Sequence, residues 1–397
     1  MNRVYMDNAA TTPVSPAVLE KMLPYFSECY GNANSIHSTG LDARKALNAA
    51  RKKVAAALNC NPEEVYFTSG GSESDNWALK GVAFANRKKG NHIITSAIEH
   101  HAILHTCEWL EKQGFEITYV PVDADGLVNP ADVEAAITDK TILISIMAAN
   151  NEIGTIEPIE EIAKIAHAHH VLFHTDAVQA IGAIPVDVRA IGCDLLSLSG
   201  HKFHGPKGVG ALYIKQGTRI DNLIHGGAQE RGRRASTENV AGIVGMAEAI
   251  ELATANIPEK AARISALRDQ LIDGLTTLPY VRLNGHRTKR LPGNVNVSVR
   301  FIEGESLLLR LDLAGVAASS GSACTSGSLD PSHVLLAIGL PHEIAHGSLR
   351  LSLSDTTTQE EVDYVLSVLP GIIEYLRDMS PLYNDFMEAQ KYCTLKR

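Results

Sequence analysis

Hydrophobic and polar positions follow two alternating patterns between about residues 60 and 215. Seven short β-branched or apolar runs predict strands over 65–67, 92–95, 116–120, 141–147, 171–174, 194–198 and 209–214. Helical spacing of apolar positions between them predicts helices over 72–86, 101–113 and 159–169. Strands that alternate with helices need crossover connections, so this part of the chain predicts a mostly parallel sheet with helices on both faces.

The pattern changes near residue 255. A long charged helix is predicted over 260–275, and shorter strands and helices follow to about residue 378, which is typical of a second, α+β domain. The string DNAATT near the start is too turn-rich for a helix and is expected to cross between the domains. We predict a large domain over 15–257, a small domain from 1–14 and 258–380, and a frayed polar tail over 381–397.

Composition narrows the class of protein. The chain has 397 residues, of which 45% are hydrophobic and 20% charged, as in an ordinary globular protein with a large core. Its formal net charge of −9 argues against a surface for nucleic acid. The start has no apolar signal core and no run reaches about 18 apolar residues, so neither secretion nor a membrane span is expected, and we predict a cytoplasmic protein.

Cysteine and histidine give no clear metal pattern. The six cysteines have no CxxC or CxH spacing, which disfavours a zinc site and a disulfide framework. The string His167-Ala168-His169-His170 resembles a metal cluster but follows a helical pattern and precedes an apolar strand. We interpret it as a solvated helix end, where histidine is favoured by the helix dipole, and expect no metal site.

One cysteine, Cys324, lies in the Gly/Ser-rich stretch 318–328, which can bury almost nothing. A thiol there suits neither of the usual structural roles of cysteine, a small core residue or a disulfide partner. Two interpretations stay open from this segment alone: the residue fell in a linker, or it is reactive.

A predicted strand ends at Gly70-Gly71, and a helical pattern starts directly afterwards at Ser72. Such a junction directs backbone N–H groups and the positive end of a helix dipole at one point, so it could hold a phosphate. The string is neither a Walker A loop nor a dinucleotide GxGxxG motif.

Two further residues follow predicted strands. Asp176 comes after the strand over 171–174, where it either faces a ligand crevice or caps the next helix. Lys202 follows the strand over 194–198 and has glycines and a proline nearby, so its stem is fixed and its amine can form a Schiff base. A phosphate cradle, an acid about 26 residues before a lysine and a parallel sheet together indicate a site for pyridoxal 5'-phosphate (PLP).

Several uncommon sequence strings, in the same order along the chain, indicate a family. The chain resembles the fold-type I PLP enzymes of the class V aminotransferase group, and within it the cysteine desulfurases of the NifS/IscS kind. The resemblance runs from residue 5 to about 383 through the strings DNAATT, TSGGSESDN, ANNEIGT, HTDAVQ, SGHKFHGPKGVG, GGAQERGRRASTENV and SSGSACTSGSLDPSHVL. It implies an α/β fold with a seven-stranded, mostly parallel sheet in the large domain.

The resemblance also implies roles for individual residues. Lys202 would carry PLP, Asp176 would pair with the pyridine nitrogen, Gln179 would bind the phenolic oxygen and His100 would stack on the ring. The remaining implied contacts are Gly71, Ser72, Ser199 and His201 for the phosphate, Thr237 for the phosphate of a second subunit in a homodimer, and Asn151 and Arg350 for the substrate.

The implied reaction converts L-cysteine to L-alanine and places the sulfur on Cys324 as a persulfide. An acceptor protein, such as a U-type iron–sulfur scaffold, would then receive the sulfur. A PLP aminotransferase or a selenocysteine lyase would share the cofactor residues, and a catalytically silent scaffold would need neither Lys202 nor Cys324. Within this group Cys324 is the residue that separates a desulfurase from a transaminase.

Overall fold

The computed structural model describes residues 3–320 and 331–394, so Cys324 lies outside the described residues. Its largest sheet has seven strands in the order β2-β8-β7-β6-β5-β3-β4, and only β8 runs antiparallel to its neighbours. The strands are β2 (Val65–Thr68), β3 (His92–Ser96), β4 (Glu116–Val120), β5 (Thr141–Ser145), β6 (Leu172–Asp176), β7 (Leu195–Ser199) and β8 (Gly210–Ile214). All seven predicted strands and the mostly parallel sheet are therefore confirmed.

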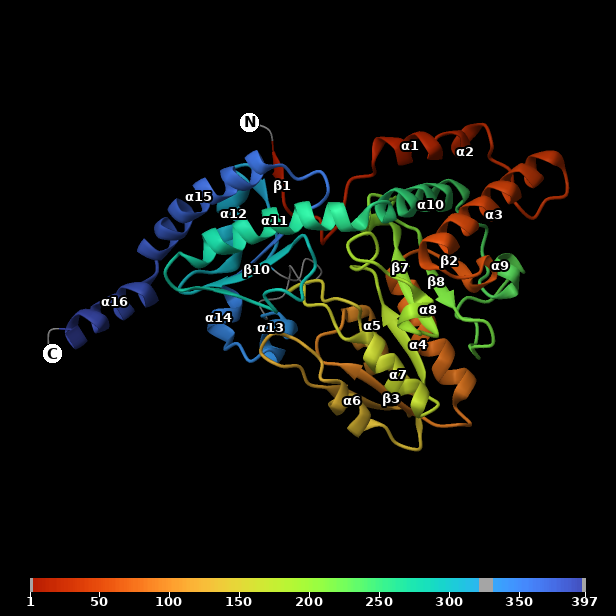
Figure 1. Cartoon of the computed structure of the whole chain (residues 1–397), viewed down its shortest axis with the longest axis horizontal. Helices are drawn as coiled ribbons and strands as arrows, with labels where there is room; N and C mark the ends of the chain where they lie inside the picture. The colour runs from red at the N-terminus through yellow and green to blue at the C-terminus, as the bar shows by residue number, and fades with distance from the viewer. Residues whose placement is uncertain (1–2, 321–330, 395–397) are drawn as a thin grey trace.

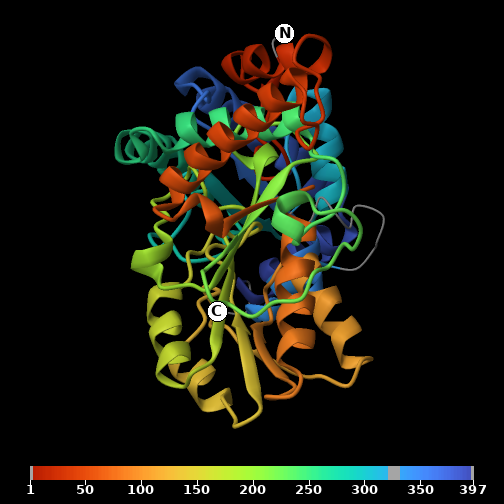
Figure 2. The same cartoon turned by 90° about the vertical axis from the view of Figure 1, so that its right-hand side faces the viewer.

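Side chains of the central strands pack into two hydrophobic clusters, one on each face of the sheet, as the alternation of side chains across a strand requires. Ile93 packs toward α4 (Gly71–Asn86) and α5 (His101–Glu111), whereas Ile94 packs toward the helices on the other face. Figure 2 shows the sheet between these two helix layers. The helices of the second face are α1 (Pro16–Met22), α3 (Ser38–Leu58), α6 (Pro130–Ala136), α7 (Ile159–Ala168), α8 (Val188–Ile191) and α10 (Val240–Thr254). The predicted helices over 72–86, 101–113 and 159–169 correspond to α4, α5 and α7.

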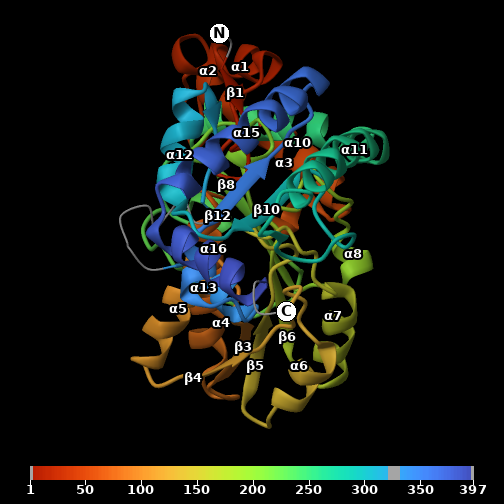
Figure 3. The ribbon, with the colours of Figure 1, turned by 90° about the vertical axis from the view of Figure 1, so that its left-hand side faces the viewer.

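A second sheet lies beside the first (Figure 3). It is antiparallel, with the order β12-β10-β9. Its strands are β9 (Val281–Leu283), β10 (Asn294–Val299) and β12 (Ser348–Ser352). The helices α11 (Ile257–Thr276), α12 (Gly304–Leu313) and α15 (Gln359–Asp378) share one hydrophobic cluster with it. The predicted α+β part and its long first helix are thus confirmed.

The junction between α10 and α11 is sharply bent, because Asn256 has a left-handed backbone (φ 54°) and Pro258 opens the second helix. In Figure 1 α10 lies beside α3, whereas α11 lies beside the small sheet. Among the described residues no single helix is long and apolar enough to cross a membrane. Only α10 and α11 together, which meet at 75°, satisfy the length and composition requirements.

The N-terminal segment joins the two sheets, as predicted from its turn-rich sequence. Strand β1 (Val4–Tyr5) pairs in parallel with β11 (Val316–Ala317), and Asp7 bridges to Ser352 of β12. Further along, the backbone N–H of Thr12 donates to the carbonyl of His201, 2.9 Å away, in the turn that follows β7. Residues of DNAATT therefore contact the turn that carries Lys202.

Two predictions, one about the end of a helix and one about the end of the chain, have different outcomes. The histidines at 167–170 do end a helix, since α7 finishes at Ala168. The predicted frayed tail is wrong, because Pro381–Thr394 form helix α16. Aromatic packing explains the order: Phe386 lies 4.8 Å from Phe301 and 5.3 Å from Tyr280, measured between ring centroids.

Candidate active site

A cavity of about 270 Å³ opens where β6 and β7 end, near the start of α4 and beside β12. It collects ten of the predicted site residues, namely Gly71, Ser72, His100, Asn151, Asp176, Gln179, Ser199, His201, Lys202 and Arg350. Thr237 does not line it, and Cys324 lies outside the described residues. Residues far apart in the sequence meet here because parallel strands end at the same edge of the sheet.

The first turn of α4 forms one end of the cavity. Gly71 and Ser72 are the first residues of the helix, where backbone N–H groups have no partner within the helix. A methyl group built on Gly70 would lie 3.7 Å from the Ser199 hydroxyl, so the Ser199 side chain lies close to this turn. Hydroxyls beside a helix N-terminus are the donor set that a phosphate requires, so this end of the cavity fits the phosphate of PLP.

Lys202 is held by the N-terminal segment. It ends a short 3-10 turn (Gly200–Lys202) after β7, and its Nζ donates to the carbonyl oxygens of Ala9 and, at 3.0 Å, Ala10. Thr12 Oγ1 donates to the carbonyl of His201 at 2.9 Å and accepts from the N–H of His204 at 2.8 Å. The turn is therefore fixed on both sides of the lysine.

Asp176 is the last residue of β6 and is 5% exposed. Its Oδ1 accepts the N–H of Val178 at 2.9 Å, and the next helix, α8, begins only at Val188, so Asp176 is not a helix cap. Burial raises the pKa of this carboxyl to about 6, against the opposing charge of Lys202. A buried carboxylate needs a cation, which the protonated pyridine nitrogen of PLP would supply.

The sequence analysis missed two buried groups behind Asp176. Asp75, on α4, lines the cavity, and its Oδ1 lies 3.8 Å from His174 Nε2. The ring of His174 bonds to hydroxyls of Ser145 at 2.8 Å and Ser197 at 3.0 Å, and burial lowers its pKa to about 3. Burial and the neighbouring Asp176 raise the pKa of Asp75 well above its ordinary value. Of the two carboxyl groups, Asp176 is therefore the one that carries the negative charge, and it is the one that would contact the pyridine nitrogen of PLP.

His100 is the N-cap of α5, and its Nδ1 accepts the N–H of Ala102 at 3.1 Å. Burial and the nearby Lys202 lower the pKa of His100 to about 4, so the ring is neutral at neutral pH. The capping bond commits Nδ1 and leaves Nε2 to exchange a proton.

Arg350 lies on β12 and is 2% exposed. Its guanidinium donates to the carbonyl of Asn151 at 2.9 Å and to Asp7 Oδ1 at 3.2 Å, and its Nε has no partner among the described residues. A buried cation with unused donors at the cavity suits a carboxylate ligand.

The loop that carries Asn151, from the string ANNEIGT, is held by the small sheet. The side chains of Asn294 and Asn296 donate to the carbonyl of Glu152 at 3.1 and 3.0 Å, and Arg290 donates to the carbonyl of Ile153 at 2.6 Å. Gly154 turns the loop with a left-handed backbone (φ 77°), and a methyl group there would lie 2.6 Å from the Asn294 side chain.

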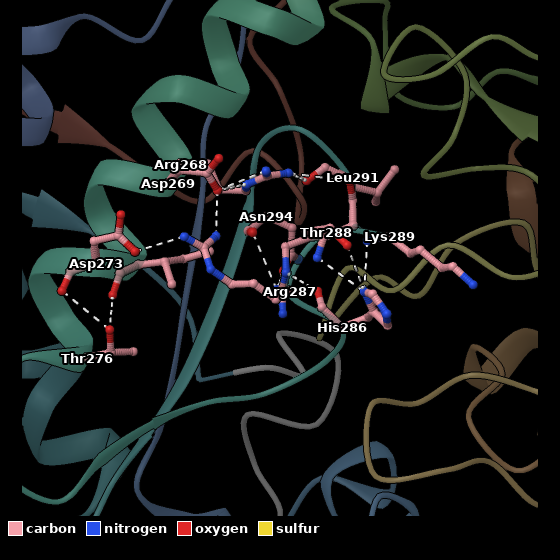
Figure 4. Close-up of polar contacts among 12 residues, drawn as sticks. Arg268, Asp269, Asp273, Thr276, His286, Arg287, Thr288, Lys289, Leu291 and Asn294 are labelled. Carbon is pink, nitrogen blue, oxygen red and sulfur yellow. Dashed lines mark hydrogen bonds and ion pairs between the residues drawn. The ribbon is translucent and has the colours of Figure 1, made fainter.

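Figure 4 shows polar contacts between α11 and the loop over 284–294, which includes Asn294. Arg287 pairs with Asp269 of α11 at 2.6 Å, and Arg268 of α11 donates to the carbonyls of Arg290 and Leu291 at 3.4 and 3.3 Å, so the helix is tied to the loop over 284–294. Arg290, by contrast, has no acidic partner among the described residues and bonds to carbonyl groups instead.

Thr237 is exposed and lies on the loop that follows α9 (Gln229–Gly232). Buried Glu230 ties this loop to α3 through two bonds from Arg51, of 2.6 and 2.7 Å, and to β2 through one of 2.9 Å from the N–H of Phe67. Arg234 makes a second anchor on Glu73, at 2.8 and 3.0 Å. The loop is thus fixed, while Thr237 is exposed and does not line the cavity of its own chain.

Residues 4–365 match the family described as aminotransferase class-V. The chain is 63% identical to a cysteine desulfurase IscS of Methanosarcina thermophila over 96% of this chain and 94% of the relative. It is 61% identical to a cysteine desulfurase IscS of Clostridium botulinum over 98% of this chain and all of that one. A solved NifS-like protein, 44% identical, superposes with a TM-score of 0.89 over 94% of this chain and 100% of that chain. The chain belongs to the class V aminotransferase family of PLP-dependent enzymes, and within it to the NifS/IscS cysteine desulfurases.

Proposed function

We propose that this enzyme converts L-cysteine to L-alanine and places the released sulfur on Cys324 as a persulfide. The observation that carries the proposal is that one cavity joins a fixed lysine, a buried acid, a helix N-terminus and an arginine with unused donors. When bound, PLP supplies an electron sink for the bond changes at the amino acid. We assign its covalent attachment to Lys202 and its phosphate to Gly71, Ser72, Ser199 and His201.

The remaining cavity residues bind the substrate and move protons. We assign the carboxylate of L-cysteine to Arg350 and Asn151, and the contact with the pyridine nitrogen to Asp176. Gln179, whose Nε2 donates to the carbonyl of Ala9 at 3.0 Å, would bind the phenolic oxygen of PLP. Lys202 and the neutral ring of His100 would move the proton of the substrate Cα.

Sulfur transfer is assigned to Cys324. Its thiolate would attack the substrate sulfur, so that an S–S bond forms while the substrate C–S bond breaks with its electron pair going to carbon. That carbon would take up a proton to give the methyl group of L-alanine. The persulfide sulfur would then pass to an acceptor protein, for which we propose an iron–sulfur scaffold of the U type.

We propose a homodimer in which Thr237 contacts the phosphate bound by the second subunit. The exposure of Thr237 and the two buried anchors of its loop support this contact. We also propose a large PLP-binding domain over 15–257 and a small domain from 1–14 and 258–380. A reducing compartment such as the cytoplasm suits the chain, since Cys29, Cys60, Cys107 and Cys193 are free thiols.

The test is to incubate the purified enzyme with PLP and L-cysteine and to measure alanine, sulfide and protein-bound persulfide. Cys324→Ala should keep the absorption of the lysine-bound cofactor but lose sulfide release. The control, Cys29→Ala, removes another free thiol and should behave like the wild type. Full sulfide turnover by Cys324→Ala would contradict the assignment of the nucleophile.

A further inference from the structure

Three histidine side chains lie together at one side of the cavity. The ring of His101, on α5, stacks on that of His105 at 4.9 Å and lies 4.8 Å from that of His333, measured between centroids. His101, His333 and Glu152 all line the cavity. His333 is the first residue of α13 (His333–Ala337), whose N-cap Ser332 donates its hydroxyl to Glu152. None of these residues has a role in the function proposed above.

His101 differs in its hydrogen bonds from two other half-buried histidines of the cavity, His100 and His333. His100 bonds through Nδ1 to Ala102, and His333 through Nε2 to the carbonyl of Glu99 at 3.0 Å. Both ring nitrogens of His101, by contrast, are shielded from solvent and have no partner among the described residues. Buried polar atoms without a partner cost free energy, so a pair of them beside a cavity indicates that a bound molecule satisfies them.

The charges around His101 define what can bind there. The pKa of His101 is lowered by burial and by His333 and His105, so the ring is neutral at neutral pH and offers one donor and one acceptor. The ring of His101 contacts those of His105, on α5, and His333, on α13. His101 therefore lies at the side of the cavity that α5 and α13 form.

The proposed substrate presents one group that the assignments above leave without a partner. Its amino group must meet PLP beside Lys202, and Arg350 and Asn151 take its carboxylate. Its thiol remains. A thiol donates a weak hydrogen bond, which the unprotonated nitrogen of a neutral imidazole can accept. Arg350 bonds to the carbonyl of Asn151, the residue before Glu152, so the carboxylate site and the His101 side are neighbours in the fold.

We propose that His101 binds the thiol of L-cysteine and is a specificity-determining residue of this enzyme. The inference rests on the function proposed above. The neutral ring accepts a hydrogen bond from the substrate S–H, and the ring of His333 packs against it. An amino acid without a thiol leaves the buried nitrogen unpaired and is bound less well relative to L-cysteine.

The experiment compares two amino acids that differ only in the thiol. For wild type and His101→Phe, single-turnover formation of alanine from L-cysteine is measured, as is the dissociation constant of L-alanine from the change in cofactor absorption. Phenylalanine keeps the stacked ring but removes both nitrogens. We expect the apparent second-order rate constant for L-cysteine to fall about tenfold, since one lost hydrogen bond has about this effect, while the L-alanine constant changes less than about twofold.

Two further variants keep the test decisive. His105→Phe alters the exposed end of the same stack and should leave both measurements unchanged. His101→Gln retains a hydrogen-bonding side chain and should recover part of the L-cysteine rate, and it replaces His101→Phe if that variant does not fold. Equal losses for both amino acids, or no loss for either, would overturn the inference. A wild-type enzyme that forms no alanine from L-cysteine would instead refute the proposed function.

Discussion

Lys202 and His101 occupy the same cavity, yet their surroundings differ. Around Lys202 the polar groups are paired before any ligand arrives: its Nζ bonds to carbonyls of Ala9 and Ala10, and His201 Nδ1 bonds to Thr11 at 3.1 Å. Around His101 the two ring nitrogens have no described partner, and the neighbouring contacts are between rings. We call these surroundings the Lys202 group and the His101 group.

The difference corresponds to what each group would bind. A cofactor that stays attached benefits from side chains already fixed in position, because ordering them is not repeated in each catalytic cycle. A substrate that enters and leaves gains specificity from polar atoms that only it can pair. The contrast is therefore testable by perturbing each group and the loop between them.

The largest effect is expected in the Lys202 group. Lys202→Ala should abolish the absorption of the lysine-bound cofactor and lower the rate of alanine formation by about 10⁴-fold or more, as for other residues that act directly in the chemistry. Lys207→Ala removes an exposed lysine from the same turn and should change neither quantity. An unchanged cofactor spectrum in Lys202→Ala would refute the role of this lysine.

A smaller effect is expected for the clamp on the loop that carries Asn151 and Glu152. Arg290→Met leaves the buried carbonyls of Ile153, Asn284 and His286 without their donor, which should lower the free energy of unfolding by about 3 kcal/mol. Chemical denaturation of the PLP-bound enzyme measures this change.

The matched control for Arg290 is Arg287→Met. Arg287 is 42% exposed and pairs with Asp269 and Asp273 near solvent, so its loss should cost about 0–1 kcal/mol. Similar destabilisation by the two substitutions would show that the buried carbonyl contacts are not what holds the loop.

The Lys202 group could be predicted from the sequence because its signals are local. β-branched runs predict the strands, and Asp176 and Lys202 directly follow the runs that became β6 and β7. The roles of Arg350 and Asn151 came only from the family resemblance. No hydrophobic or polar pattern around either residue indicates a cavity. Arg350, for example, reaches the cavity only because β12 contacts segments that are distant in the sequence.

Other features needed the folded chain. Asp75 and His174 stand within the strings TSGGSESDN and HTDAVQ, but only packing shows that they meet behind Asp176. Arg290 contacts Ile153, 137 positions away, a pairing that no periodicity reports. The tail prediction was wrong because the aromatic residues that order α16 find their partners at Tyr280 and Phe301.

The last effect depends on pH and concerns Glu99, whose backbone carbonyl bonds to His333 Nε2 at 3.0 Å. Its Oε1 accepts bonds from Ser96 at 2.7 Å and from the N–H of Met147 at 3.0 Å, and glutamine can keep both. Burial raises the pKa of Glu99 from 4.5 to about 8, so the folded state holds a proton that the unfolded state releases. Stability from this group is therefore full below about pH 4.5 and is lost as pH rises toward 8.

Glu99→Gln removes that titration and keeps the shape of the side chain. The variant should gain stability over the wild type by about 1.4 kcal/mol for each pH unit between the two pKa values. Denaturant unfolding of both proteins, with saturating PLP at three pH values in this range, gives the difference directly, because the other titrating groups are common to both. Parallel stability curves would mean that Glu99 is already ionised in the folded enzyme.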